Sequence, residues 1–221
     1  MLLLALDTAT PAVTVATWDG VHVLAEMTTV DARRHGELLA SSIDTVLAKT
    51  GAGRLDLTAV AAGTGPGPYT GLRAGLVTAR VLGSALGIPV AGVGTLDVIA
   101  ADAVAAAGGR EFLVATDARR RELYWARYDG AGRRLAGPAV STPADLAPDG
   151  PDGPPVAGTG PLLYPDVLGE PIGPGYPAAG TLARLAAARL AAGEPVPGAE
   201  PIYLRRPDAR VPGPPKRVTA P

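Results

Sequence analysis

Residues 61–75 restrict the fold of this chain more than any other stretch. They read Ala-Ala-Gly-Thr-Gly-Pro-Gly-Pro-Tyr-Thr-Gly-Leu-Arg-Ala-Gly. Because glycine can adopt positive φ and proline holds φ near its turn value, this composition prescribes an unusual backbone path. The apolar run at 57–62 is typical of a buried strand, and the apolar segment at 72–86 is long enough for a helix. The sequence therefore predicts a strand–loop–helix joint.

This joint has two interpretations. Backbone N–H groups that a glycine loop brings to a helix N-terminus can stabilise a phosphate or a carboxylate. On that interpretation Gly63, Gly65 and Gly67 are candidate phosphate-binding residues. Alternatively, the loop only turns the chain tightly. Glycine-rich loops outnumber phosphate sites, so glycine content by itself favours the tight turn.

The composition of the chain argues against several classes of protein. Lys and Arg total 20 against 21 for Asp and Glu, which disfavours a stand-alone nucleic-acid binder, although the local run Arg119 to Arg121 can contribute within a complex. There is no cysteine, which excludes disulfides and thiolate nucleophiles. The two histidines, His22 and His35, have no metal-ligand spacing, so we expect no metal site.

The hydropathy of the chain bears on its location. Residues 1–6 are apolar but carry no basic residue and meet Asp7 at once, so they indicate a first strand and not a signal peptide. No uncharged run approaches the ~20 residues that a membrane-spanning helix needs. We therefore expect no contact with a membrane and a cytoplasmic protein.

The first half of the chain has a regular order of elements. Apolar runs at 2–6, 12–18 and 21–28, with the hairpin signal Asp19-Gly20, predict three antiparallel strands. A helical pattern at 35–49 follows, then the joint and its helix, a strand from residue 88 and a helix at 95–107. Small residues recur every four positions along the helix after the joint, at Gly71, Gly75, Ala79 and Gly83. Such a groove lets another backbone approach closely, within one domain or across a subunit interface.

The second half repeats parts of the first. A strand at 112–116 ends at Asp117, and Asp129-Gly130 supplies a second hairpin signal. The segment Ala62-Gly63-Thr64-Gly65-Pro66 recurs as Ala157-Gly158-Thr159-Gly160-Pro161. Chance could produce the second match in a chain with 29 Gly and 23 Pro, but both matches in the same order favour duplication of a βββαβα unit. The second copy shows little helical pattern between Pro138 and Pro155 and gains a helix at 181–192.

Tandem units with an acidic turn after the first strand are typical of the actin-like nucleotide-binding fold of sugar kinases and Hsp70-type ATPases. We therefore expect an α/β chain of two actin-like (ASKHA, ribonuclease H-like) domains at 1–108 and 109–205, with a disordered tail at 206–221. In that fold ATP lies between the halves and the first-strand carboxylate positions a metal-bound phosphate. Asp7, Thr8 and Thr10 are the candidates here. A Walker A loop is excluded, because the only lysines are Lys49 and Lys216.

Several motifs carry a closer resemblance. They are Leu-Ala-Leu-Asp-Thr-Ala-Thr at 4–10, His-Gly-Glu-Leu-Leu at 35–39, the joint from Gly63, Asp-Ala-Arg-Arg at 117–120 with Glu122 and Tyr124, and Pro-Ile-Tyr-Leu-Arg at 201–205. Through them the chain resembles the bacterial TsaB family. The resemblance implies a non-catalytic scaffold subunit of the complex that forms N6-threonylcarbamoyladenosine in tRNAs reading codons that begin with A.

The resemblance also implies which chemistry is absent. In the related TsaD subunit, which performs the transfer, paired histidines hold a metal after the corresponding strand. Here Thr95 and Ile99 stand where the two ligands would fall. Threonine is at most a weak ligand and isoleucine is none, so this chain is expected to hold no metal and to catalyse no transfer.

Partners follow from the resemblance as well. It implies a heterodimer with TsaD, a homodimer when the chain is alone, and contact with TsaE and tRNA only through the complex. The expected interface uses first-half helices, through Leu39, Ile43 and Val46 and through the groove of Gly71, Gly75, Ala79 and Gly83. We expect no tightly bound cofactor, with ATP or ADP placed at an interface of the complex.

Two other functions stay open. The chain can be an ATP-dependent phosphotransferase or ATPase of the actin-like fold, with Asp7 on the metal and the Gly63 and Gly158 loops around the phosphates. Against it, Leu162-Leu163-Tyr164-Pro165 is a poor opening for an anion-binding helix. A peptidase has less support, because the sequence offers no metal-ligand pair and no cysteine.

Overall fold

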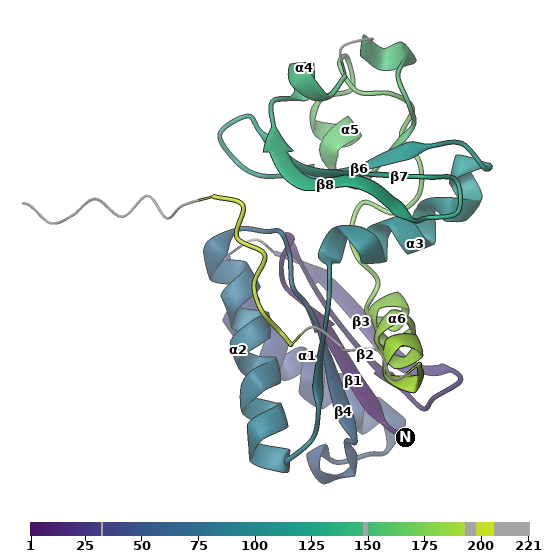
Figure 1. The fold of residues 1–221 in the computed structure, drawn as a ribbon. Helices are drawn as coiled ribbons and strands as arrows, with labels where there is room; N and C mark the ends of the chain where they lie inside the picture. Colours follow the sequence, from purple (N-terminus) through teal and green to yellow (C-terminus); the bar gives the residue numbers. More distant parts are fainter. Residues whose placement is uncertain (32, 148–149, 193–197, 206–221) are drawn as a thin grey trace, which may run out of the picture.

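The computed structural model describes residues 1–31, 33–147, 150–192 and 198–205, and Figure 1 shows that they form two lobes, each built on a β-sheet. The tail expected to be disordered, 206–221, lies outside the described residues. The first lobe contains a sheet of order β3-β2-β1-β4-β5. Its strands are β1 (Leu3–Asp7), β2 (Ala12–Trp18), β3 (Val23–Val30), β4 (Ala59–Gly63) and β5 (Val90–Val93). The first three strands are antiparallel neighbours, whereas β4 and β5 run parallel to β1.

Helices cover both faces of this first sheet. Because side chains alternate along a strand, Leu4 and Leu6 of β1 join the core under α1 (His35–Thr50) and α2 (Tyr69–Leu86). Leu3 and Ala5 face the other way, into a core completed by α6 (Ala179–Ala191). The apolar runs of β1 and β4 are thus buried on both faces, which is why they show no polar alternation. The expected order of elements in the first half is confirmed.

The second lobe is a reduced copy of the first. Its sheet has the order β8-β7-β6-β9, with β6 (Phe112–Asp117), β7 (Leu123–Tyr128), β8 (Arg134–Ser141) and β9 (Val156–Ala157). As in the first sheet, the first three strands are antiparallel and the next is parallel to the first. Two single-turn helices, α4 (Pro143–Leu146) and α5 (Gly160–Leu163), stand where the first lobe has α1 and α2. This arrangement confirms the duplicated actin-like α/β fold.

Two helices tie the lobes together. The first is α3 (Thr95–Ala107), whose Leu96 and Ile99 pack with Phe112 and Tyr128 of the second sheet; Figure 1 shows it between the sheets. The second is α6, which lies in the part of the chain expected to form the second unit. It packs on the first sheet instead, with Leu182 and neighbouring alanines against β1, β4 and β5. None of the helices in the described part of the chain combines the length and apolarity needed to span a bilayer.

Candidate functional site

The first-strand carboxylate is closed off from solvent. Asp7 is fully buried at the end of β1. Its Oδ1 accepts a hydrogen bond from the Ala9 N–H at 2.7 Å, and its Oδ2 accepts one from the Thr95 hydroxyl at 2.7 Å. Burial raises the pKa of Asp7 to about 6, against a smaller lowering by these two hydrogen bonds. The carboxylate is therefore held by the protein itself.

The glycine loop closes over this carboxylate. A Cβ on Gly63 would lie 1.9 Å from Asp7 Oδ2, and a Cβ on Gly67 would lie 2.1 Å from the carbonyl oxygen of Ala9. Gly65 has φ of 85°; its N–H donates to the Thr95 hydroxyl at 3.1 Å, and its carbonyl accepts from the Thr95 N–H at 2.8 Å. The three glycines thus let the loop pack against the β1–β2 turn, as the tight-turn interpretation predicts.

The second glycine loop is packed in the same way. Gly158 has φ of 91°, and a Cβ on it would lie 2.3 Å from the carbonyl oxygen of Ala115 in β6. The segment after it forms only the four-residue α5. Both glycine loops therefore lie against the first strand of their own lobe.

The two threonines of the β1–β2 turn have structural partners. The Thr8 hydroxyl donates to the Gly71 carbonyl at 2.7 Å and accepts from the Gly75 N–H at 2.9 Å. A Cβ on Gly75 would lie 2.5 Å from this hydroxyl. Thr10, 4% exposed, accepts from the Ala12 N–H through its hydroxyl at 3.2 Å. The turn and the first half of α2 are thus locked together.

The groove of small residues on α2 lies inside the first lobe. Gly71 and Gly75 face the β1–β2 turn, Ala79 is fully buried, and a Cβ on Gly83 would lie 2.2 Å from Val90 of β5. The expectation that this groove binds a partner is therefore corrected. The groove packs against other parts of the same lobe, as the alternative interpretation of the sequence had it. The physical reason is the close approach of α2 to the sheet beneath it.

The apolar face of α1 is also internal. Leu39, Ile43 and Val46 are 2%, 4% and 0% exposed and pack in the core of the first lobe. These side chains are therefore not available to a partner, contrary to expectation. The solvent faces of the two helices carry other residues. On α1 they are small and charged residues, and on α2 they include Val77 and Val81, which are 58% and 60% exposed, together with exposed arginines.

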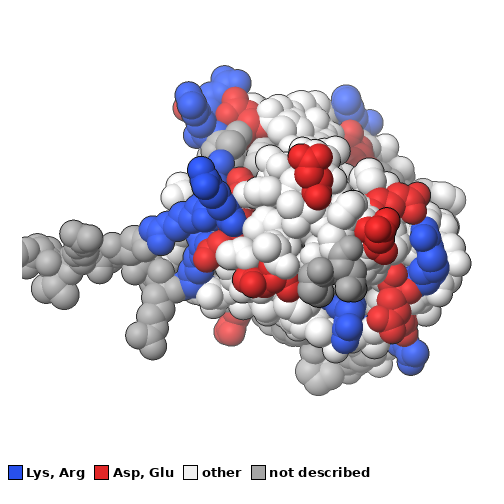
Figure 2. Space-filling model, turned by 90° about the horizontal axis from the view of Figure 1, so that it is seen from above, with Lys and Arg blue, Asp and Glu red and all other residues white. Residues whose placement is uncertain are grey.

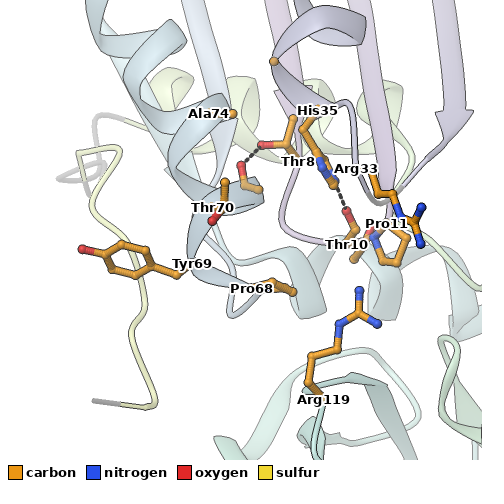
Figure 3. A pocket seen from close by; sticks show the side chains of 12 residues that line it. Thr8, Thr10, Pro11, Arg33, His35, Pro68, Tyr69, Thr70, Ala74 and Arg119 are labelled. Atoms are coloured by element: carbon orange, nitrogen blue, oxygen red, sulfur yellow. Dashed lines mark hydrogen bonds between the residues drawn. The ribbon is translucent and has the colours of Figure 1, made fainter. Parts of the chain in front are cut away.

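A cavity of about 440 Å³ opens where α1 and α2 begin. Figure 3 shows its lining, with Arg119 reaching toward it from the second lobe and Arg33 from the first. Thr8, Thr10 and His35 also line it, and His35 Nε2 lies 2.9 Å from the carbonyl oxygen of Thr10. Since a carbonyl only accepts, Nε2 carries the proton. A neighbouring cavity of about 300 Å³ shares Pro68, Tyr69 and Arg119 with the first.

The turn that presents Arg119 has an unusual backbone. Arg119, Arg120 and Arg121 have φ of 62°, 56° and 60°, a left-handed conformation that costs non-glycine residues energy. Two backbone hydrogen bonds between Ala118 or Arg119 and Glu122 close the turn, and the Arg119 N–H donates to Asp117 at 2.7 Å. The sequence had suggested these arginines as a charged patch, and Arg119 and Arg120 also as part of a family motif. Their left-handed conformation has no sequence signal, because glycine is the residue expected there.

The segment 198–205 crosses the cleft between the lobes. The Ile202 N–H donates to the Thr64 carbonyl at 2.9 Å, and Tyr203 packs on Tyr69 with ring centroids 5.3 Å apart. Arg205 then reaches the second lobe, where it donates to the Ala118 carbonyl at 2.7 Å and pairs with Glu122. The motif at 201–205 is thus a clasp between the lobes.

Charge is mixed around this cleft. Seen from above in Figure 2, blue side chains gather most densely on the left, with red ones among them, and both colours are scattered over the rest of the visible face. Within the described residues, no group of three His, Asp or Glu side chains is arranged to hold a metal ion. Thr95 and Ile99 stand where the metal-binding histidines of TsaD would fall. Here the Thr95 hydroxyl donates a hydrogen bond to Asp7, and Ile99 is buried against the second sheet.

Comparison with protein families and known proteins gives consistent matches. The family model described as "TsaD: tRNA N6-adenosine threonylcarbamoyltransferase" matches residues 22–186. An uncharacterised Mycobacterium tuberculosis protein is 46% identical over 94% of this chain and 93% of its own length. The tRNA threonylcarbamoyladenosine biosynthesis protein TsaB of Escherichia coli is 38% identical over 58% of this chain and 55% of its own. The structure of YeaZ from Pseudomonas aeruginosa is 32% identical with a TM-score of 0.77, covering 92% of this chain and 99% of that one.

Proposed function

Given that this chain belongs to the tRNA N6-adenosine threonylcarbamoyltransferase (TsaD) family as a TsaB-like member, we propose that it is a non-catalytic subunit of the complex that forms N6-threonylcarbamoyladenosine in tRNA. It takes part in threonylcarbamoyladenosine biosynthesis by binding and supporting the TsaD-type transferase subunit. The tRNAs served are those that read codons beginning with A, and the work is done in the cytoplasm, where tRNA is modified.

The observation that carries the non-catalytic role is the state of Asp7. An actin-like phosphotransferase needs this carboxylate turned toward a metal-bound phosphate. Here Gly63 and Thr95 cover it, and both of its oxygens accept hydrogen bonds from the protein. Exposing the Asp7 carboxylate would break its hydrogen bond with Thr95, which joins the end of β1 to the start of α3. The geometry therefore supports a scaffold more than an ATPase.

The surface that we assign to TsaD is the solvent face of α1 and α2. Tyr69, Val77 and Val81 are 42%, 58% and 60% exposed along one helix, and Gly36 and Ala40 are exposed on its neighbour α1. Small residues allow close approach of a partner helix, and exposed valines supply apolar area that gains stability when covered. This proposal keeps the two helices that the resemblance implied and replaces the buried residues with exposed ones.

Other partners follow from the same surface. We assign it to a homodimer when TsaD is absent, because one apolar face can serve either partner. Contact with TsaE and with tRNA then occurs through the assembled complex. ATP or ADP, expected at an interface of that complex, belongs to the assembly in this proposal and not to a catalytic centre of this chain.

The test is co-purification with the TsaD subunit of the same organism. Val77→Glu places a charge at the centre of the exposed face, and we expect it to abolish the complex while the fold persists. Leu135→Glu is the matched control, because Leu135 is 47% exposed on β8 of the other lobe. Undiminished recovery of TsaD with folded Val77→Glu would remove the assigned surface. Loss of TsaD with Leu135→Glu alone would move the interface to the second lobe.

A further inference from the structure

We infer that a belt of arginines and tyrosines on the outer surface of the cleft binds a single-stranded loop of RNA directly. Three elements contribute to this belt, namely the start of α2, the turn between β6 and β7, and the clasp. Its members are Tyr69, Arg73, Arg119, Arg120, Arg121, Tyr203 and Arg205. The inference deepens the proposed function and rests on it for the identity of the RNA, which is tRNA.

The three elements form one continuous surface. Tyr69, Arg119 and Arg205, one from each element, line the same cavity of about 300 Å³. Arg73 extends the surface along α2, because its guanidinium lies 3.7 Å from the centre of the Tyr69 ring and its Nε donates to the Tyr203 hydroxyl at 3.0 Å. Figure 3 shows Tyr69 pointing toward the clasp segment. A ligand on the clasp therefore also meets α2 and the second lobe.

The turn between β6 and β7 presents three consecutive arginines in a costly conformation. Arg119, Arg120 and Arg121 are all exposed, and all three have φ near 60°. Glycine would adopt this backbone without strain, whereas arginine does not. Strain of this kind is typical of functional sites, where the side chain has a task that glycine cannot perform. We assign that task to the three guanidinium groups.

The belt carries an excess of positive charge. Two carboxylates pair with its arginines: Asp117 lies 3.3 Å from Arg119, and Glu122 pairs with Arg205. Five arginines against these two carboxylates leave three positive charges on one surface of a chain whose net charge is −1. The charge is therefore local, which suits a contact made within a larger complex and not a stand-alone nucleic-acid binder.

Arginine together with tyrosine favours single-stranded RNA over an acidic protein segment. Guanidinium groups bind phosphate oxygens through paired N–H donors. Unpaired bases stack on tyrosine rings and on guanidinium planes. Tyr69 and Tyr203 are 42% and 43% exposed, so part of each side chain is open to a base. The exposed apolar area that a protein partner needs lies farther along α2, at Val77 and Val81.

The experiment is filter binding of a tRNA transcript that reads codons beginning with A. It is titrated with the full chain alone and with the complex of the chain and TsaD, at several salt concentrations. We expect the chain alone to bind in the roughly 1–100 μM range of non-specific nucleic-acid contacts, and the complex to bind more tightly. Absence of saturable binding by both would overturn the inference.

A triple variant of the turn, Arg119→Gln with Arg120→Gln and Arg121→Gln, locates the site. We expect about 10-fold weaker binding or more, and a slope of log affinity against log salt that is smaller by about two. The control removes the same charge from exposed positions outside the belt, through Arg127→Gln, Arg133→Gln and Arg184→Gln. Equal weakening by the two triple variants would mean general electrostatics and would overturn the belt.

A glycine variant guards against loss of folding. Arg120→Gly with Arg121→Gly keeps the left-handed turn, because glycine adopts positive φ without strain. The melting temperature should therefore be kept while tRNA binding weakens by about 10-fold. Binding of tRNA by this stable variant at the original affinity would contradict the inference.

Competition tests whether the ligand is single-stranded. An unstructured RNA oligonucleotide should displace the tRNA at a concentration at least about 10-fold lower than an RNA duplex of the same length, because only its bases are free to stack. Equal competition by the duplex would show that phosphates alone are recognised and would overturn the single-stranded assignment.

The outcomes separate this inference from the proposed function. If the complex with TsaD forms and the triple variant of the turn binds tRNA as the original chain does, the belt is overturned and the proposed function stands. If the original chain does not co-purify with TsaD, the proposed function fails, and the titrations of the chain alone still decide the belt. Loss of TsaD from the triple variant, with tRNA binding by the chain alone unchanged, would assign the belt to a protein partner and overturn the inference.

Discussion

The pH dependence of stability should reveal the state of Asp7. The pKa of Asp7 is raised from 3.8 to about 6 because burial disfavours its charged form. In this pH range the folded state binds more protons than the unfolded state, so stability falls as pH rises through the window from 3.8 to about 6. Above the window the charged carboxylate destabilises the fold by about 3 kcal/mol, from about 1.4 kcal/mol per pKa unit.

Asp7→Asn removes the charge and keeps the shape of the side chain. The amide oxygen can still accept from Ala9, and the amide N–H can donate to the Thr95 hydroxyl. We expect the variant to gain about 2.5 kcal/mol relative to the original chain on going from about pH 4 to about pH 8. Asp7→Asn also changes stability through its altered hydrogen bonds, but this contribution is the same at both pH values and cancels when the two are subtracted.

The assay is urea unfolding of both chains, followed by circular dichroism at several pH values. Asp166→Asn is the control, because it makes the same substitution at an exposed position of the second lobe. A difference between the Asp7→Asn and original chains that is the same at every pH would refute the reasoning. So would a relative loss of stability of Asp7→Asn toward high pH, because both results require a solvated or strongly stabilised carboxylate.

Three other changes test the packing around the β1–β2 turn and the clasp. Gly75→Ala forces a Cβ to 2.5 Å from the Thr8 hydroxyl and should cost roughly 1–3 kcal/mol of unfolding free energy. Gly36→Ala is the control: its Cβ meets open space, so it should be neutral or slightly stabilising. Equal melting temperatures of the two variants would show that the close contact at Gly75 is absent. Thr8→Val removes the hydroxyl that donates to the Gly71 carbonyl and accepts from the Gly75 N–H. It should cost about 1–3 kcal/mol in the same urea assay, and an unchanged midpoint would contradict these hydrogen bonds. Tyr203→Ala removes the ring that packs on Tyr69 and should speed proteolysis after residue 198 without lowering the main melting transition. Proteolysis at the original rate would argue against the clasp.

The sequence predicts the first lobe well because its signals are local. Apolar runs such as 2–6, the Asp19-Gly20 hairpin and the helical pattern after His35 each correspond to an observed element. The duplication is also visible, because turn residues are kept at equivalent places. These features depend on the period of apolar residues and on turn chemistry, which a sequence carries directly.

The second lobe was harder to predict because it is degenerate. Strand β8 contains Gly137-Pro138 in its interior, which hides it from a strand pattern. β9 has only two residues, and its neighbours set its pairing. The pattern of α6 is helical, but nothing in that pattern says which sheet its alanine face covers.

The candidate site shows the same limit. The sequence places Asp7 and the Gly63 loop at the same site, and the structure brings them into contact. Whether the loop exposes or covers the carboxylate depends on distances of a few ångströms, which the sequence does not give. The apolar side chains of Leu39 and Ile43 were expected to contact a partner, whereas they pack against the sheet of their own lobe. Arg33 and Arg119 are far apart in sequence, and both line one cavity only because the two lobes lie together.

The central claim is that this chain supports a transferase subunit and catalyses no reaction itself. Its most direct test is mass spectrometry of tRNA nucleosides after deletion of the gene. We expect N6-threonylcarbamoyladenosine to disappear, to return with the original chain and with Asp7→Asn, and to stay absent with Val77→Glu. Persistence of the nucleoside in the deletion strain would contradict the proposed function. Failure of a stably folded Asp7→Asn chain to restore the nucleoside would contradict the non-catalytic role.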